Sequence, residues 1–286
     1  MKRIIVSFLL VVVFSTWAAA ETSVWKAQKG TSIIYLGGTC HVLRETDYPL
    51  PPEFDKAYQA SDIVVFETDL GKLQDPSTQQ RLLAKSMYAD GSTIDKHLSA
   101  QAYATLSDYC EANGIPLQAL QQFKPSMLMI TLTIMELMKS GVSQRGVDQA
   151  FYDLAKKDGK AVMGLETVDQ QIDFVASMAD GNEDEFVTYA IRDMKTLKQQ
   201  YGVLVEAWRT GDTVKLQEIM VSELKSRWPE LYKRLITDRN RNWLPRIDAY
   251  RKTPQREFVL VGAGHLVGPD GILAALQKKG YTIEKL

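Results

Sequence analysis

The chain has 286 residues, and its 34 basic and 35 acidic side chains leave a formal net charge of −1. This balance argues against the strongly basic surface with which proteins bind nucleic acids or anionic membranes. The two cysteines, Cys40 and Cys110, could pair in an oxidising compartment, but two cysteines do not make a disulfide framework.

The first twenty residues have the pattern of a secretory signal peptide. Lys2 and Arg3 give a short positive start, Ile4 to Trp17 is an almost unbroken apolar run, and Ala18–Ala20 offers small residues for cleavage. The apolar run is too short for a lasting membrane span, and no cysteine directly follows it to carry a lipid anchor. We therefore predict a signal peptide over residues 1–20 and a periplasmic or secreted mature protein. The alternative is an uncleaved N-terminal anchor.

The remaining elements follow from hydrophobic periodicity and from Gly and Pro positions. In chain order, the pattern predicts a strand over Ser32–Leu36, a helix over Glu53–Gln59, a strand over Asp62–Phe66, and helical sequence from Gln74 to Asn113 that breaks near Asp90 and Gly91. It continues with helices over Met127–Met138 and Gly146–Lys157, a strand over Lys160–Leu165, helical sequence from Val168 to Ile247 with a turn at Thr210–Asp212, a strand over Glu257–Val261, a helix over Gly271–Lys279 and a strand over Tyr281–Glu284.

Strands thus lie towards both ends of the chain, with a large helical block between them. This order predicts an α/β fold in which one sheet is assembled from N- and C-terminal strands around a large central helical insertion. No repeat or linker divides residues 21–286, so a single domain is expected there. The methionine-rich segment Met127–Met138 is too short to cross a bilayer. It is either a buried helix or a flexible wall for an apolar ligand.

Two of the three histidines stand in matching contexts. Gly38 to His41 follows the first predicted strand, Gly262 to His265 follows the fourth, and both segments read Gly-x-x-His. Open α/β sheets bind ligands at the carboxyl ends of their strands, where glycine lets the backbone turn sharply. Two such loops on neighbouring strands would aim both imidazoles at one point.

Glu67 follows the second predicted strand and would supply a carboxylate beside the two histidines. A His, His and Glu set suits a divalent metal such as Mn²⁺, Zn²⁺ or Fe²⁺. An open coordination position would then carry a water of lowered pKa for attack on a carbonyl or a similar centre.

Each of these residues also has a plainer interpretation. His41 and His265 could be hydrogen-bonded packing residues, and Glu67 could face solvent at its strand end. His97 lacks the glycine frame and is interpreted as a surface residue. Cys40 could be a thiol ligand or nucleophile, but a small buried core residue is favoured. Gly262, Gly264 and Gly268 imitate a dinucleotide fingerprint loosely, with too little chain after them for the rest of a nucleotide-binding half.

Beyond these two loops, segments along the whole chain resemble the TraB/GumN family, which includes the Tiki-type metalloproteases. The segments that carry the resemblance are Leu36–His41, Leu50–Glu53, Ala60–Asp62 with Val64–Asp69, Gly146–Asp148, Gly164–Thr167 with Gln170 and Gln171, Trp208 with Gly211–Asp212, Arg239–Asn240 with Trp243, Val261–Leu266 with Gly268, and Gly280–Tyr281. The family is similar in fold to metal-dependent hydrolases that include the erythromycin esterase-like proteins.

The resemblance implies a metal or general-base centre at His41, Glu67 and His265. It makes Arg239 a candidate for anchoring an anionic group or stabilising an oxyanion, unless Arg239 is only an exposed helix charge. Glu166 has a weaker claim, because a structural cap or core hydrogen bond explains it equally well. Cys40 departs from the family pattern, where an apolar residue is expected.

Two functions are compatible with these residues. The first is an exported metal-dependent hydrolase, in particular a peptidase, with Glu67 and Arg239 as catalytic residues. Its cofactor would be Mn²⁺ or Co²⁺, with Zn²⁺ or Fe²⁺ as alternatives, and its substrate a peptide or small molecule. The second is a periplasmic protein that binds a signal peptide or a polysaccharide precursor in the same crevice without cleaving it.

Overall fold

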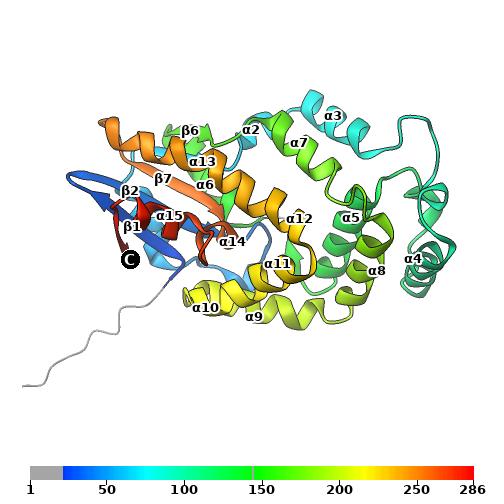
Figure 1. Ribbon diagram of the computed structural model, residues 1–286. Coiled ribbons are helices and arrows are strands. Elements are labelled where there is room, and N and C mark those ends of the chain that lie inside the picture. Colours follow the sequence, from blue (N-terminus) through cyan, green and yellow to red (C-terminus); the bar gives the residue numbers. More distant parts are fainter. Residues whose placement is uncertain (1–21, 144) are drawn as a thin grey trace, which may run out of the picture.

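The computed structural model describes residues 22–143 and 145–286. The predicted export signal over residues 1–20 lies outside this described part. A twisted sheet occupies one end of the molecule, and most of the helices from α3 to α8 form a lobe at the other end (Figure 1). The predicted α/β fold, a sheet of N- and C-terminal strands with a central helical insertion, is confirmed.

The main sheet has six strands in the order β6-β4-β7-β2-β1-β8. Their bounds are β1 Val24–Lys29, β2 Ser32–Thr39, β4 Ile63–Phe66, β6 Ala161–Gly164, β7 Glu257–Gly262 and β8 Thr282–Lys285. β6, β4, β7 and β2 run parallel to one another, whereas β1 is antiparallel to both β2 and β8. Two short strands, β3 (Leu43–Arg44) and β5 (Val142–Ser143), form a separate ladder. All five predicted strands are present, and β1 is one that the sequence pattern did not reveal.

The helices surround this sheet and fill the insertion. Their bounds are α1 Pro52–Gln59, α2 Leu70–Leu73, α3 Pro76–Ser86, α4 Ala100–Ala112, α5 Pro125–Met138, α6 Val147–Asp158, α7 Val168–Ala176, α8 Glu183–Met194, α9 Leu197–Arg209, α10 Thr213–Gln217, α11 Glu223–Arg227, α12 Pro229–Tyr232, α13 Asp238–Ala249, α14 Ala263–Leu266 and α15 Ile272–Lys278. Within the described residues, none of them is long and apolar enough to cross a membrane.

The first long helical prediction breaks where expected, near Asp90 and Gly91, whereas the second is interrupted more often than expected. Gln74–Asn113 contains α3 and α4 with a non-helical stretch between them, because Gly91 adopts a left-handed conformation (φ 71°) and Asp90 caps the turn at Ser92. Val168–Ile247 is divided into the helices from α7 to α13. The predicted turn at Thr210–Asp212 is present, where Asp212 caps α10, and Pro229 at the start of α12 marks a further break.

Each face of the sheet carries its own core. β7 is buried along its whole length, and its side chains alternate between the two faces, as a fully covered strand requires. Phe258 and Leu260 pack with side chains from α1, α6 and α9. Val259 and Val261 pack with side chains from α13 and α15. β7 is thus held in the middle of the sheet, between the strands that end near Glu67 and His41.

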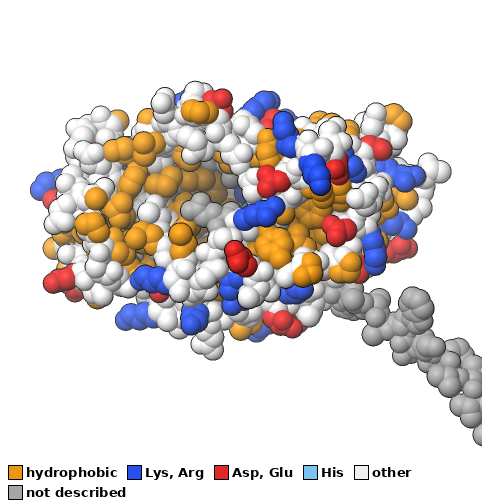
Figure 2. All heavy atoms as spheres, turned by 180° about the vertical axis from the view of Figure 1, so that it is seen from behind, with side chains coloured by type: hydrophobic (Ala, Val, Ile, Leu, Met, Phe, Trp, Pro, Cys, Tyr) orange, Lys and Arg blue, Asp and Glu red, His pale blue; other side chains and the backbone are white. Residues whose placement is uncertain are grey.

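The helical lobe has a third core, formed mainly by α4, α5 and α8. In α5, Leu128, Met129 and Leu132 are buried in this core, whereas Met135 and Met138, towards the C-terminal end of the helix, are exposed. The buried-helix interpretation therefore holds for part of α5. Seen from behind, hydrophobic side chains gather in a hollow on the helical half of the molecule (Figure 2).

Candidate functional site

The predicted residues lie together at the carboxyl ends of three neighbouring parallel strands. β7 pairs with β2 on one side and with β4 on the other. His41 lies two residues beyond β2, Glu67 directly follows β4, and His265 lies in α14 directly after β7. The two Gly-x-x-His loops therefore do follow neighbouring strands, with the carboxylate of Glu67 on the opposite side of β7 from His41.

Gly262, at the end of β7, marks the point on which the three side chains converge. A Cβ atom built on Gly262 would lie 3.3 Å from Glu67 Oε1, 3.5 Å from His41 Nε2 and 3.6 Å from His265 Cδ2. A side chain at this position would therefore fill the space between the imidazoles and the carboxylate. Glycine keeps that space open, and its N–H donates a hydrogen bond to Glu67 Oε1 at 2.8 Å.

Glu67 is a buried, ionised carboxylate with only 8% of its surface exposed. Burial by itself would raise its pKa. Arg239, His265 and His41 together with the Gly262 N–H outweigh burial and hold the pKa of Glu67 well below its ordinary value. Glu67 Oε2 accepts a hydrogen bond from Arg239 Nη2 at 2.6 Å, and Oε1 lies 3.9 Å from His265 Nε2. The interpretation of Glu67 as a solvent-facing strand end is wrong.

Asn240 determines which nitrogen of His265 carries the proton. Its Nδ2 donates to the backbone oxygens of His265 and Asp270, at 3.1 Å and 3.0 Å. Asn240 Oδ1 is then left to accept from His265 Nδ1 at 2.8 Å. Arg239 Nη1, which can only donate, lies 3.1 Å from His265 Nε2. Both contacts require a proton on Nδ1 and a lone pair on Nε2, and burial lowers the pKa of His265 to about 3.

Asp148 orients His41 in a similar way. His41 Nδ1 lies 2.8 Å from Asp148 Oδ2, in the first turn of α6. The negative charge of Asp148 raises the pKa of His41 to about 9. Because Nδ1–H donates to the carboxylate, Nε2 is the nitrogen that gains or loses a proton. The His41 side chain remains 61% exposed, so a substrate can reach it.

Arg239 lies beneath the site as a buried cation, with 9% of its surface exposed, and is not an exposed helix charge. Its Nε and Nη2 donate to both oxygens of Glu166, at 3.1 Å and 2.8 Å. Its guanidinium also packs over the ring of Trp243, 4.5 Å from the centroid. Burial raises the pKa of Glu166 despite this pairing, because one guanidinium serves two carboxylates. With both carboxylates ionised, this buried group carries one negative charge in excess.

Cys40 is a buried residue next to His41. Burial strongly raises the pKa of its thiol, with Asp148 and Asp47 adding to the effect. A thiol of this kind is a poor nucleophile and a poor metal ligand, so the structure favours the core interpretation. Cys40 and Cys110 are both free and buried. His97 is exposed and stacks on Tyr88, as expected of a surface residue.

The donor set fits a divalent metal in kind and in orientation. His265 Nε2 carries a lone pair, His41 Nε2 faces the space beside Gly262, and Glu67 is ionised. Each histidine donates its other ring N–H to an oxygen, which is the arrangement that orients metal-bound histidines. As they stand, however, no three His, Cys, Asp or Glu side chains in the described part of the chain are grouped to hold a metal. Arg239 Nη1 takes the lone pair that a metal would need.

Sequence reasoning assigned no role to Asp148 or Asn240, although both lie in segments that carry the family resemblance. Gln171, whose Oε1 accepts from Arg239 Nη2 at 3.2 Å, was missed in the same way. Neither motif spacing nor periodicity connects these residues to the histidines. Asp148 is 107 positions from His41, and only the packing of α6 and α13 against the strand ends brings the partners together.

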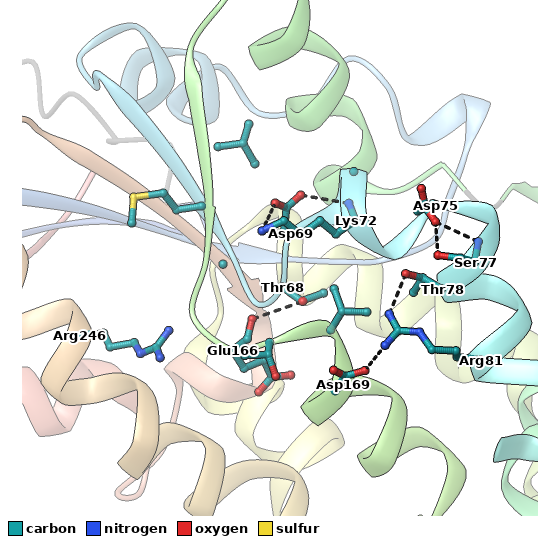
Figure 3. A pocket seen from close by; sticks show the side chains of 16 residues that line it. Thr68, Asp69, Lys72, Asp75, Ser77, Thr78, Arg81, Glu166, Asp169 and Arg246 are labelled. Atoms are coloured by element: carbon teal, nitrogen blue, oxygen red, sulfur yellow. Dashed lines mark hydrogen bonds and ion pairs between the residues drawn. The ribbon is translucent and has the colours of Figure 1, made fainter.

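A cavity of about 780 Å³ adjoins the site on the outer side of Glu166. It is lined by strand β6 and by side chains from α2, α3, α7 and α13, many of them charged (Figure 3). His41, Glu67 and His265 do not line this cavity, whereas Thr68 and Glu166 do. The cavity therefore lies next to the site on the side of β6, with Glu166 between it and Arg239.

Comparisons with known proteins identify the family. The model of the TraB/PrgY/gumN family matches residues 23–285. The chain is also similar to the metalloprotease TIKI2 of Danio rerio: the two are 25% identical, over 87% of this chain and 58% of the relative. The chain thus spans less than two thirds of the length of that protein. No solved structure matches it.

Proposed function

This chain belongs to the TraB/PrgY/gumN family, and we propose that it is an exported, metal-dependent hydrolase that cleaves peptides. The observation that carries the proposal is the common orientation of the two histidines. Asn240 and Asp148 each hold a ring Nδ1, so that both Nε2 atoms are directed to the space beside Glu67. Two separate side chains, Asn240 and Asp148, are placed to orient the rings in this way. Histidines that served only to pack would not need such orientation.

The electrostatic balance of the site also supports a bound cation. Glu67 and Glu166 share the single charge of Arg239, whereas the carboxylate of Asp148 is paired with His41. Such an excess of buried negative charge is costly unless a cation offsets it. His41, Glu67 and His265 would hold a divalent ion, with Mn²⁺ or Co²⁺ expected and Zn²⁺ or Fe²⁺ as alternatives. When bound, the ion supplies a Lewis acid and a water of lowered pKa.

The residues of the chain have separate parts in this proposal. Glu67 orients the attacking water by accepting a hydrogen bond from it, since its carboxylate lies at the convergence point and its lowered pKa makes it a weak proton acceptor. Arg239 stabilises negative charge on the substrate, because its Nη1 faces the same space as His265 Nε2. The name of the relative, a metalloprotease, supports peptides as the substrate class, and the pattern of residues 1–20 supports export.

The first experiment is the metal content of the mature chain, measured by mass spectrometry beside a His41→Ala/His265→Ala double variant. His97→Ala is the matched control, because His97 lies on the surface away from the site. We expect about one metal per wild-type and control chain, and none in the double variant. Cleavage of a peptide library should follow metal content and be lost in Glu67→Gln. Absence of metal after reloading with Mn²⁺ or Co²⁺ would refute the proposal.

One observation favours the second candidate, a binding protein without turnover. Arg239 Nη1 already donates to the lone pair of His265 Nε2. This nitrogen therefore has a partner without a metal. The same crevice would then hold a signal peptide or a polysaccharide precursor without a metal. A Glu67→Gln chain that keeps its ligand affinity while the wild type cleaves nothing would support this candidate over the hydrolase.

A further inference from the structure

Strand β6 forms an open edge of the main sheet. Among the described strands it pairs with β4 alone. Leu165 N donates to Phe66 O, so the N–H of Leu165 points towards β4. Because backbone groups alternate along a strand, those of Val162 and Gly164 point away from β4. These two residues therefore offer unpaired N–H and C=O groups to an additional strand.

The cavity beside Glu166 lies along this edge. Its lining includes Val162, Met163 and Gly164. In Figure 3 the strand that leads to Glu166 passes between Arg246 on one side and Asp69 with Lys72 on the other. An extended chain placed against β6 would thus lie between two walls of charged side chains.

Most charged side chains on these walls are paired with each other. Lys72 pairs with Asp69 at 3.5 Å, and Arg81 pairs with Asp169 at 2.6 Å. Two are not in an ion pair within the part of the chain that the structure describes: Asp75, which accepts hydrogen bonds from Ser77, and the exposed Arg246. The groove therefore offers a positive charge at Arg246, which a carboxylate on the occupant would complement, and a negative charge at Asp75.

We propose that the substrate binds as an extended peptide that adds a strand to β6 and places an acidic side chain at Arg246. This inference rests on the proposed peptidase function and names how its substrate is held. Main-chain hydrogen bonds to an exposed sheet edge give affinity, and pockets for alternate side chains give selectivity. We refer to the cavity along Val162–Gly164 as the β6 groove.

The β6 groove lies within reach of Glu67 for an extended chain. Neighbouring strands lie about 4.8 Å apart, so a strand added to β6 runs about 10 Å from β4, the strand that ends at Glu67. Three residues of extended chain span roughly 10 Å. A peptide bound along Val162–Gly164 therefore reaches Glu67 within about three residues, passing over Glu166.

The test separates binding from cleavage. Decapeptides are selected from a random display library on the chain carrying His41→Ala, and the consensus peptide is synthesised with a fluorescent label. Its affinity is measured by anisotropy for the His41→Ala chain and for the same chain with Arg246→Gln or Arg241→Gln added. Arg241 is the matched control, because it lies on the same helix, is 74% exposed and does not line the groove.

We expect the selected peptides to share one acidic position. Arg246→Gln should weaken binding about tenfold, the loss expected for one charge-assisted contact, while Arg241→Gln should leave it unchanged. A peptide that carries lysine at the acidic position should bind the Arg246→Glu chain better than the chain that keeps Arg246. Methylation of the peptide backbone nitrogens should weaken binding at every second position, because only alternate N–H groups face β6.

Two outcomes would overturn the inference: no peptide selected above background, or binding that is indifferent to Arg246→Gln and to N-methylation. The fate of the proposed function is read separately, by incubating the consensus peptide with the metal-loaded wild type. A peptide that binds along β6 but is never cleaved contradicts the hydrolase only. Cleavage of peptides whose binding ignores Arg246 contradicts the β6 groove only.

Discussion

Asn240 offers the most direct test of how the site is built. The Asn240→Ala variant removes the hydrogen bond to His265 Nδ1 and the two bonds to the backbone oxygens of His265 and Asp270. Asn240 is buried, so its three partners lose their hydrogen bonds in an environment with little water. The prediction concerns both the stability of the chain and the proton on His265.

The expected loss of stability follows from the number of unsatisfied groups. An unpaired buried polar group costs at least about 1 kcal/mol, so three of them should lower the free energy of unfolding by about 3 kcal/mol. In a chain of this length, the Tm should fall by roughly 6–12 °C. Asn242→Ala is the matched control, because Asn242 is exposed on the same helix, and its Tm should stay close to that of the wild type.

The proton on His265 is observed by NMR. The chain has three histidines, so ¹⁵N-histidine labelling and single variants assign every ring. In the metal-free wild type, His265 should stay neutral from pH 5 to pH 9, with its proton on Nδ1. In Asn240→Asp, a carboxylate beside Nδ1 should raise the pKa of His265. A wild-type His265 that carries its proton on Nε2, or an Asn240→Ala chain as stable as Asn242→Ala, would refute this account.

Three other predictions follow. The pKa of His41 is raised from 6.5 to about 9, so the protonated His41 stabilises the fold below pH 6.5, and this stabilisation is lost as pH rises towards 9. Urea unfolding of the wild type should therefore give a lower free energy of unfolding at pH 9 than at pH 6, and Asp148→Asn should abolish this part of the difference. Gly262→Ala should abolish metal binding and cleavage, because the new methyl group fills the convergence point, while circular dichroism shows an unchanged fold. Cys40 and Cys110 should both react with a thiol reagent only after unfolding, since both are free and buried; one disulfide per chain by mass would contradict this.

The sequence predicted the parts of the fold that depend on local pattern. The five predicted strands lie within a few residues of the observed ones, although β2 continues to Thr39, beyond its predicted end at Leu36, and β2 and β7 proved to be neighbours. β1 was missed because Val24–Lys29 mixes polar and apolar residues. Its role as the strand between β2 and β8 arises only from pairing with distant residues. Such long-range pairing is not visible in a local window.

The sequence pointed to the two histidines of the site but not to the residues that orient them. Glycine before a histidine is a local signal, and it appears twice. The residues that set the protons, Asp148 and Asn240, are far from the histidines in sequence and ordinary in their local context. A carboxylate or an amide at a helix start is usually a cap. Their importance depends on the packing of α6 and α13 against strand ends that the sequence alone did not place together.

Arg239 connects the two functions considered for this chain. Its position is determined mainly by Glu166, whose two oxygens accept from Nε and Nη2, and by the ring of Trp243. Its Nη1 is the part directed at His265. A metal on His265 Nε2 would displace only this one contact, and the paired face of the guanidinium would stay in place. Arg239 can therefore stabilise a carboxylate cluster in the metal-free chain and face developing negative charge in the metal-bound one, without any change of rotamer at Glu166.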